Sequence, residues 1–277
     1  MARRKFLKFK LTKKQKRNII VLLAMGLCIL GVFLFFKHHA QPLRSGIPMF
    51  HRQTGRPKIV FVIDDIGNYN KYDASLKSLG NNVTYAILPL LPYSRYYGDL
   101  SRTTGAEVIL HLPLDTVQDK IPGRGLIVGT MSQEDVLEML ARDLDSVPNY
   151  VGVNNHMGSR GTTDREMMTT ILSDLKRRHL FFLDSYTTKE SVVPSVGKAI
   201  GIPILARGVF LDNNDSKSAI RSQLNELRVV AREKGNAIAI GHYRKKTLEV
   251  LADEIPRFKN EGFEIITLKE MLKIQRD

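Results

Sequence analysis

The feature that most constrains the fold is a regular alternation of short apolar runs with amphipathic segments, which begins at Lys58 and continues to the C-terminus. Strands that alternate with helices form parallel sheets, because each crossover helix returns the chain to the same end of the sheet. Eight runs have the length and composition of strands: 58–64, 83–88, 107–111, 150–153, 180–183, 204–207, 237–240 and 263–266. The chain is therefore predicted to be an α/β protein.

An open, doubly wound sheet and a barrel produce the same linear pattern. No glycine-rich phosphate-binding loop follows any of the strands, so a nucleotide site has no support. This favours a (β/α) barrel of seven to eight parallel strands, which is closed, distorted or incompletely closed. Three predicted helices carry an N-terminal capping signal, at Ser132 with Asp135, Thr163 with Glu166, and Asp215.

The N-terminus predicts a membrane anchor. Residues 1–18 are strongly basic, and the uncharged residues 19–36 would rise about 27 Å as a helix, close to the thickness of a hydrocarbon core. The positive-inside rule places the basic tip in the cytoplasm. We expect a single-pass protein of the bacterial inner membrane, with residues 37–57 as a linker and residues 58–277 as an exported domain. The alternative is secretion after cleavage of a signal peptide.

Net charge and cysteine content narrow the function classes. The formal charge of +14 arises mainly from the first 37 residues, which hold ten Lys or Arg and no acid; the remainder has 32 basic and 28 acidic residues, or +4. No nucleic-acid partner is therefore predicted. The single cysteine, Cys28, lies in the apolar stretch, so the exported domain has no disulfide framework and no cysteine nucleophile.

Residues capable of chemistry follow most of the predicted strands. The carboxyl ends of parallel barrel strands meet at one face, where active sites are built. Each of these residues has an ordinary structural alternative, such as a helix cap or an ion-pair partner. The residues are Asp64, Asp65, His111, Asp115, His156, Asp184, Arg207, Asp212 and His242.

Two imidazoles and one carboxylate of this group, His111, His156 and Asp65, form a set that can bind zinc or another divalent first-row metal. The other four histidines lie elsewhere: three are in the linker, and His179 ends a predicted helix. We therefore predict a metal centre at the carboxyl face. Zinc is the favoured metal, with cobalt, nickel and iron as alternatives.

The chain resembles the divergent polysaccharide deacetylases, distant relatives of the carbohydrate esterases that remove acetyl groups from glycans. The resemblance covers roughly residues 57–275 and rests on six blocks in the order found in that family. They are Ile63-Asp64-Asp65-Ile66-Gly67, His111-Leu112-Pro113-Leu114-Asp115, Pro122-Gly123 with Met131-Ser132, Asn154-Asn155-His156-Met157-Gly158-Ser159, Phe182-Leu183-Asp184-Ser185 and Gly241-His242.

The resemblance implies roles for these residues. Asp64 would be the general base, Asp65 a metal ligand and His242 the general acid. Typical members carry His-x-x-x-His, but here the segment is His111-x-x-x-Asp115. Either His156 or Asp115 would therefore complete the ligand set. Asp184 is a further ligand or a residue that supports one, and Arg207 and Asp212 are assigned to substrate binding.

The resemblance implies a metal-dependent hydrolase that removes acetyl groups from cell-envelope glycan. Two alternatives stay open: a non-catalytic envelope protein that keeps the fold for glycan or protein binding, and a hydrolase of another ester or amide. The chain has no Trp. A sugar ring would therefore stack on Tyr69, Tyr93, Tyr186 or Tyr243.

Overall fold

The computed structural model describes residue 13 and residues 55–118 and 120–274. The chain from residue 55 onward belongs to one compact unit. The predicted basic tip (1–18), membrane anchor (19–36) and linker (37–57) lie outside the described residues, apart from residues 13 and 55–57. None of the helices in the described part has the length and hydropathy needed to span a membrane.

The strands form one parallel sheet, in the order β6-β5-β4-β3-β2-β1-β8-β7, with β9 paired to the start of β1. The strands are β1 (Lys58–Ile66), β2 (Thr84–Ile87), β3 (Glu107–Leu114), β4 (Tyr150–Met157), β5 (Phe181–Asp184), β6 (Ile204–Ala206), β7 (Val209–Phe210), β8 (Asn236–His242) and β9 (Glu264–Ile265). Neighbours in the sheet from β1 to β6 are also neighbours in sequence, as in a barrel built from consecutive βα units.

The two ends of the sheet are joined by the chain itself and share no hydrogen-bonded ladder. β6 and β7 are the end strands, and only Arg207 and Gly208 separate them. The backbone N–H of Arg207 donates to the carbonyl of Asp184 on β5, and that of Gly208 donates to Ile238 on β8. The predicted barrel, incompletely closed, is thus confirmed. The prediction missed β7, since a two-residue strand has no periodicity to detect.

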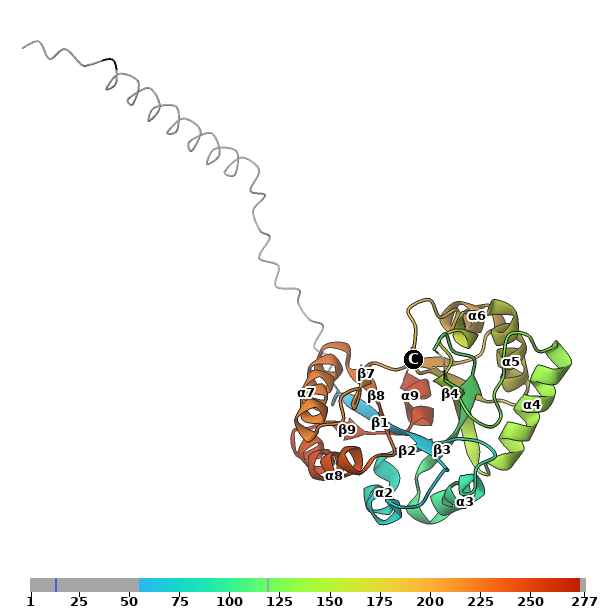
Figure 1. Cartoon of the computed structure of the whole chain (residues 1–277). Helices are drawn as coiled ribbons and strands as arrows, with labels where there is room; N and C mark the ends of the chain where they lie inside the picture. Colours follow the sequence, from blue (N-terminus) through green and yellow to red (C-terminus); the bar gives the residue numbers. More distant parts are fainter. Residues whose placement is uncertain (1–12, 14–54, 119, 275–277) are drawn as a thin grey trace, which may run out of the picture. The chain divides into compact units, whose positions relative to one another are not determined.

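Helices surround the ring of strands (Figure 1). These outer helices are α2 (Asp73–Leu79), α3 (Ser94–Thr104), α4 (Gln133–Ser146), α5 (Arg165–Arg177), α6 (Val193–Ile200), α7 (Lys217–Lys234) and α8 (Lys245–Asn260). A further helix, α9 (Leu268–Ile274), follows β9, and 3-10 turns lie at Gly80–Asn82 and Gly161–Thr163.

The predicted helix caps are correct in one case of three. Ser132 and Asp135 form the predicted capping box of α4. The Thr163 prediction was wrong: Thr163 ends a 3-10 turn and its hydroxyl donates to the carbonyl of Arg160, so the carboxylate of Asp164 accepts from the first turn of α5 instead. The Asp215 prediction was also wrong.

Ser216, the next residue, caps α7 by accepting from the N–H of Ala219. The carboxylate of Asp215 pairs with Lys246, 3.2 Å away, and is directed to the start of α8. In both failed predictions the neighbouring polar residue has the extended backbone that a cap requires.

Two apolar layers hold the fold together. The larger layer lies between the sheet and the outer helices. The smaller layer fills the barrel with inward-facing side chains of alternating strand positions, such as Val60 and Val62 of β1, and Leu268 and Met271 of α9 pack against it. Figure 1 shows α9 inside the outline of the strand ring.

The carboxylate of Glu107, at the start of β3, accepts hydrogen bonds from the N–H groups of Leu268 and Lys269. The amino end of β3 therefore fixes the start of α9, which closes that end of the barrel. The opposite, carboxyl end carries the residues of interest.

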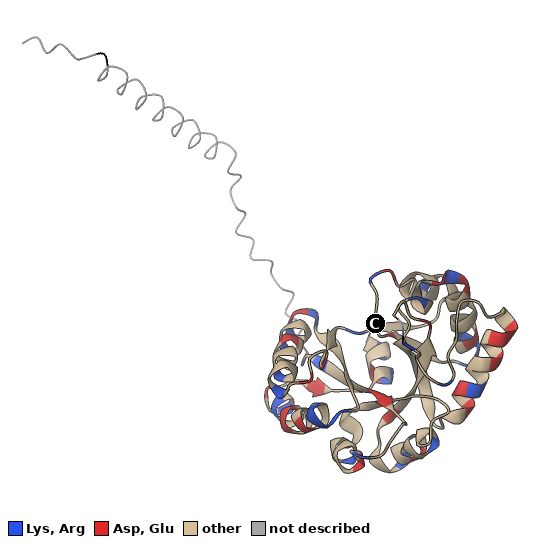
Figure 2. Cartoon of the chain, viewed as in Figure 1, with Lys and Arg blue, Asp and Glu red and all other residues tan. Residues whose placement is uncertain are grey.

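Charged residues of both signs lie mainly on the outer helices, and the strands are largely uncharged (Figure 2). Acidic positions on the strands are therefore set apart from the surface charge, and two of them lie at the end of β1.

Candidate active site

The end of β1 places two adjacent carboxylates in the same site. Neighbouring side chains of a regular strand point to opposite faces, but Asp65 has a positive φ of 64°, and the register with β2 shifts between Ile63 and Ile66. As a result, an oxygen of Asp64 and one of Asp65 lie 3.6 Å and 3.3 Å from the same atom, Nε2 of His111. Such a backbone costs about 1–3 kcal/mol and is typical of functional sites.

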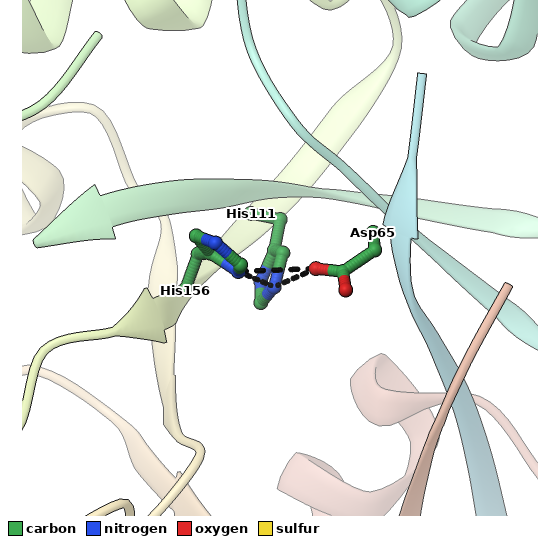
Figure 3. A group of neighbouring side chains, drawn as sticks. All are labelled: Asp65, His111 and His156. Carbon is green, nitrogen blue, oxygen red and sulfur yellow. Dashed lines mark hydrogen bonds and ion pairs between the residues drawn. The ribbon is translucent and has the colours of Figure 1, made fainter. Parts of the chain in front are cut away.

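Asp65, His111 and His156 form a compact group of candidate metal ligands (Figure 3). Oδ1 of Asp65 lies 3.3 Å from Nε2 of His111 and 3.0 Å from Nδ1 of His156. The two imidazole nitrogens are 3.1 Å apart. The group draws one residue each from β1, β3 and β4, whose carboxyl ends converge here.

The group fits a divalent cation. Oδ1 of Asp65 is buried and makes no hydrogen bond with acceptable geometry among the described residues, although two imidazoles adjoin it. Ligand atoms about 2.0–2.1 Å from a tetrahedral zinc ion lie about 3.3–3.4 Å from one another. The three observed separations are within a few tenths of an ångström of that value. Two imidazoles and a carboxylate also suit the chemistry of zinc.

Asn154 of β4 orients His111. Its amide nitrogen donates to Oδ1 of Asp64 at 3.0 Å, so its oxygen faces Nδ1 of His111 at 2.8 Å. Nδ1 therefore carries the proton, and the lone pair of Nε2 is directed toward Asp65 and His156. Asn154 is fully buried and also donates to the hydroxyl of Ser185, which in turn donates to the carbonyl of Asn155.

His242, at the end of β8, approaches the group from the other side. It pairs with Asp64 in the β1–β8 ladder, and its Nε2 lies 3.8 Å from Oδ2 of Asp65. Its Nδ1 lies 2.8 Å from Oδ1 of Asp212. The second oxygen of Asp212 accepts from the backbone N–H of His242 and from the hydroxyl of Thr247. Asp212 is completely buried.

Burial and the neighbouring charges move the pKa values of these groups in different directions. Burial raises the pKa of Asp64, although His111 and His242 oppose the change. Burial acts in the same direction on Asp65, but His111 and His156 hold its pKa well below the usual value. Adjacent carboxylates that differ in this way suit different tasks.

Burial would also raise the pKa of Asp212, yet its bonds to His242 and Thr247 lower it. Burial alone would lower the pKa of His242, but the hydrogen bond with Asp212 and the charge of Asp65 raise it overall. The Asp212–His242 pair thus favours an ionised carboxylate beside a protonated imidazole.

Asp115 and Asp184, which were predicted as possible metal ligands or supporting residues, lie outside the candidate ligand group. Oδ2 of Asp115 lies 3.5 Å from Nη1 of Arg160. Of the two alternatives for the third ligand, the structure therefore brings His156, and not Asp115, to Asp65 and His111. Asp184 is completely buried and accepts from the backbone N–H of Tyr186 and the hydroxyl of Ser191.

A cavity of about 360 Å³ is lined by residues that contact the candidate site. Ser185 and Phe210 line it, and each contacts a site residue: Ser185 bonds to Asn154, and the ring of Phe210 packs against His242 with centroids 5.2 Å apart. The predicted substrate-binding residue Arg207 also lines this cavity, whereas Asp212 lies behind His242.

The sequence prediction missed the role of Asn154. Residues two apart on a strand share a face, so Asn154 and His156 both point into the barrel end, and His111 pairs with Asn154 in the β3–β4 ladder. The two-residue spacing of Asn154 and His156 was therefore the sequence signal that could have identified Asn154. Of the four tyrosines considered for sugar stacking, Tyr69 and Tyr186 are 39% and 42% exposed, while Tyr243 is buried.

Comparisons with known proteins match most of this chain. Residues 61–272 match the family model described as divergent polysaccharide deacetylase. An uncharacterized protein of Haemophilus influenzae is 36% identical over 195 residues, which cover 70% of this chain and 69% of that protein. The uncharacterized protein YibQ of Escherichia coli is 31% identical over 194 residues, which cover 70% of this chain and 61% of that protein.

Among solved structures, an uncharacterized protein from Agrobacterium tumefaciens has the same fold, with a TM-score of 0.74 and 21% sequence identity. The match covers 80% of this chain and 93% of that one. The residues that the family model matches include every residue of the candidate site.

Proposed function

This chain belongs to the divergent polysaccharide deacetylase family, and we propose that it is a metal-dependent hydrolase that removes acetyl groups from a cell-envelope glycan. The observation that supports this most strongly is the juxtaposition of three metal-binding side chains with Asp64 and His242. The ligand atoms of Asp65, His111 and His156 lie 3.0–3.3 Å apart, and the two further residues flank them.

Asp65, His111 and His156 would hold the cation, and zinc is our proposal for its identity. When bound, such an ion supplies Lewis-acid chemistry: it polarises the acetyl carbonyl and lowers the pKa of water. Asn154 keeps the tautomer of His111 that presents Nε2 to this position. The strained backbone at Asp65 aims its carboxylate at both imidazoles.

Asp64 and His242 would handle the protons. Asp64 accepts the proton of the attacking water as general base, and Asn154 holds its carboxylate through the bond to Oδ1. His242 donates a proton from Nε2 to the departing amine or alkoxide. Asp212 acts as a positioning residue: its bond to Nδ1 orients the ring and stabilises the protonated imidazole.

We further propose that the protein is anchored in the bacterial inner membrane by residues 19–36, with the barrel outside the cytoplasm. This rests on the basic residues 1–18 and the uncharged apolar stretch that follows them. The location would bring the carboxyl face of the barrel to envelope glycans.

The test is acetate release by the purified full-length protein, loaded with zinc, from N-acetylated and O-acetylated oligosaccharides, together with metal content by elemental analysis. Asp64→Asn should abolish turnover and leave the metal content unchanged. Asp253→Asn is the matched control, since it makes the same change on the outer surface, where Asp253 pairs with Arg221. A stoichiometric metal with no acetate release from any acetylated glycan would favour the non-catalytic alternative.

A further inference from the structure

Arg207 is fixed by bonds along one edge of its guanidinium group. Its Nε donates to the carbonyl of Ser185 at 2.7 Å, and Nη2 donates to the carbonyl of Tyr186 at 2.9 Å. The guanidinium carbon lies 4.9 Å from the centre of the Phe210 ring. The side chain is therefore held in one orientation before any ligand arrives, which lowers the entropic cost of binding.

The opposite edge of the guanidinium group has no partner among the described residues. Among these residues Nη1 makes no hydrogen bond, and no carboxylate lies within ion-pair distance of Arg207. The two oxygens of the nearby Asp184 accept instead from Tyr186 and Ser191. Nη1 and the second N–H of Nη2 remain as two parallel donors with a full positive charge. Such a fork matches the two oxygens of a carboxylate.

The cavity that Arg207 lines has the character of a site for a polar, negatively charged ligand. Among the described residues, no acidic side chain lines it, and the other polar side chains carry neutral hydroxyl or amide groups that suit sugar hydroxyls, including Thr116, Gln118, Ser159 and Asn213. Arg207 is the single charged residue among the described residues that line it. An anion placed here would meet one cation and no carboxylate among the described lining residues; the buried Asp184 and Asp64 act on the charge of Arg207 but do not line the cavity.

Tyr186 provides an aromatic face in the same cavity. It is 42% exposed, and it has a positive φ of 51°, which is uncommon for a residue other than glycine. Asp184 accepts from its N–H and Arg207 donates to its carbonyl, so two buried or half-buried charged residues hold this backbone in place. Aromatic faces of this kind pack against sugar rings.

We propose that Arg207 selects an acidic glycan, by binding the carboxylate of a sugar residue that neighbours the acetylated sugar, with Tyr186 stacked on one of the rings. The inference deepens the proposed function and rests on it for the choice of a glycan as the ligand. Two residues that line the cavity contact the candidate site: Ser185 contacts Asn154, and Phe210 contacts His242. An acidic sugar in the cavity would therefore lie next to this site.

The experiment compares two oligosaccharides of equal length that both carry N-acetyl groups: the hyaluronan tetrasaccharide, which contains carboxylates, and chitotetraose, which has none. Binding to the full-length protein is measured by titration calorimetry with and without zinc, and acetate release is measured in parallel. Wild type should bind the acidic tetrasaccharide about tenfold or more tightly, as a charge-assisted bidentate contact predicts. Added salt should weaken only this binding.

Arg207→Gln should remove the preference for the acidic tetrasaccharide and leave the affinity for chitotetraose nearly unchanged. Arg207→Lys should retain part of that preference. The matched control is Arg102→Gln, because Arg102 also donates through Nε and Nη2, here to the side-chain amide oxygen of Asn149, but lies on α3 and does not line the cavity. It should keep the preference.

Equal affinity of wild type for the two tetrasaccharides would overturn the inference, and so would an equal loss of both affinities in Arg207→Gln with its fold intact by circular dichroism. Should Arg207→Gln not fold, a salt-independent preference in wild type would still count against it. A preference for the acidic ligand without acetate release from either would support the inference and count against the hydrolase.

Discussion

Nδ1 of His242 lies 2.8 Å from Oδ1 of Asp212, and this contact determines which nitrogen of the imidazole faces Asp65. Asp212 is completely buried, and its other oxygen accepts from the backbone N–H of His242 and from Thr247. Three contacts thus fix the carboxylate, and the carboxylate in turn fixes the ring of His242.

We expect Asp212→Asn to lower the rate of acetate release by about 10²- to 10⁴-fold, the range associated with the loss of a positioned general acid. The amide can present its NH₂ group to Nδ1 and favour the opposite tautomer. Zinc content should stay unchanged, because Asp212 is not one of the candidate ligands. Thr247→Val is the control that keeps the carboxylate and removes one of its bonds; it should have a much smaller effect. A large loss of bound zinc in Asp212→Asn would contradict this assignment.

His156→Ala should reduce zinc affinity by more than about 100-fold, since removal of even a group that only supports a ligand costs 10- to 100-fold. Elemental analysis and competition with a chelator measure the effect. His179→Ala is the matched control, because His179 follows α5, outside the candidate ligand group. Full zinc content in His156→Ala would remove His156 from the ligand set and return Asp115 to consideration.

Asn154→Leu should weaken zinc binding by about 10- to 100-fold, as expected for loss of the residue that orients a metal-bound histidine. The substitution removes the acceptor for Nδ1 of His111 and the donor for Asp64 at the same time. Asn154→Asp is informative because it keeps the acceptor and loses the donor. We expect it to retain most of the zinc affinity and to lose activity. Equal zinc affinity in Asn154→Leu and wild type would show that His111 needs no such partner.

The barrel was predictable from the sequence because its strands are short apolar runs bounded by polar residues at regular intervals. The convergence of Asp65, His111 and His156 followed from parallel-strand geometry, although the three strands extend two to four residues beyond their predicted ends. The positions of Asp64 and Asp65 relative to one another did not follow, since they depend on the positive φ of Asp65 and not on a residue pattern.

The pairing of Asp212 with His242 was also not predictable. Asp212 follows β7, which has two residues and no periodicity, and the role predicted for it was substrate binding. Only the β7–β8 pairing of Val209 with Ala239 and of Phe210 with Ile240 shows that it reaches His242. A contact between segments 30 residues apart depends on this pairing.

We expect the carboxyl group of Asp143, on α4, to destabilise the folded state increasingly as pH rises, and a substitution there to remove this effect. It is completely buried, and neither carboxylate oxygen has a hydrogen-bond partner among the described residues. Burial raises its pKa to about 8 from 3.8. The folded state therefore holds a proton that the unfolded state has already lost between about pH 4 and pH 8.

Because the folded state binds more protons in this window, the free energy of unfolding falls as pH rises, by up to about 1.4 kcal/mol per pH unit. Asp143→Asn should flatten this dependence and raise the melting temperature at pH 8 more than at pH 5. The control is Asp145→Asn, an exposed position on the same helix, which should leave the pH dependence unchanged. Parallel pH profiles of wild type and Asp143→Asn in thermal unfolding would show that the carboxyl group is partnered in solution.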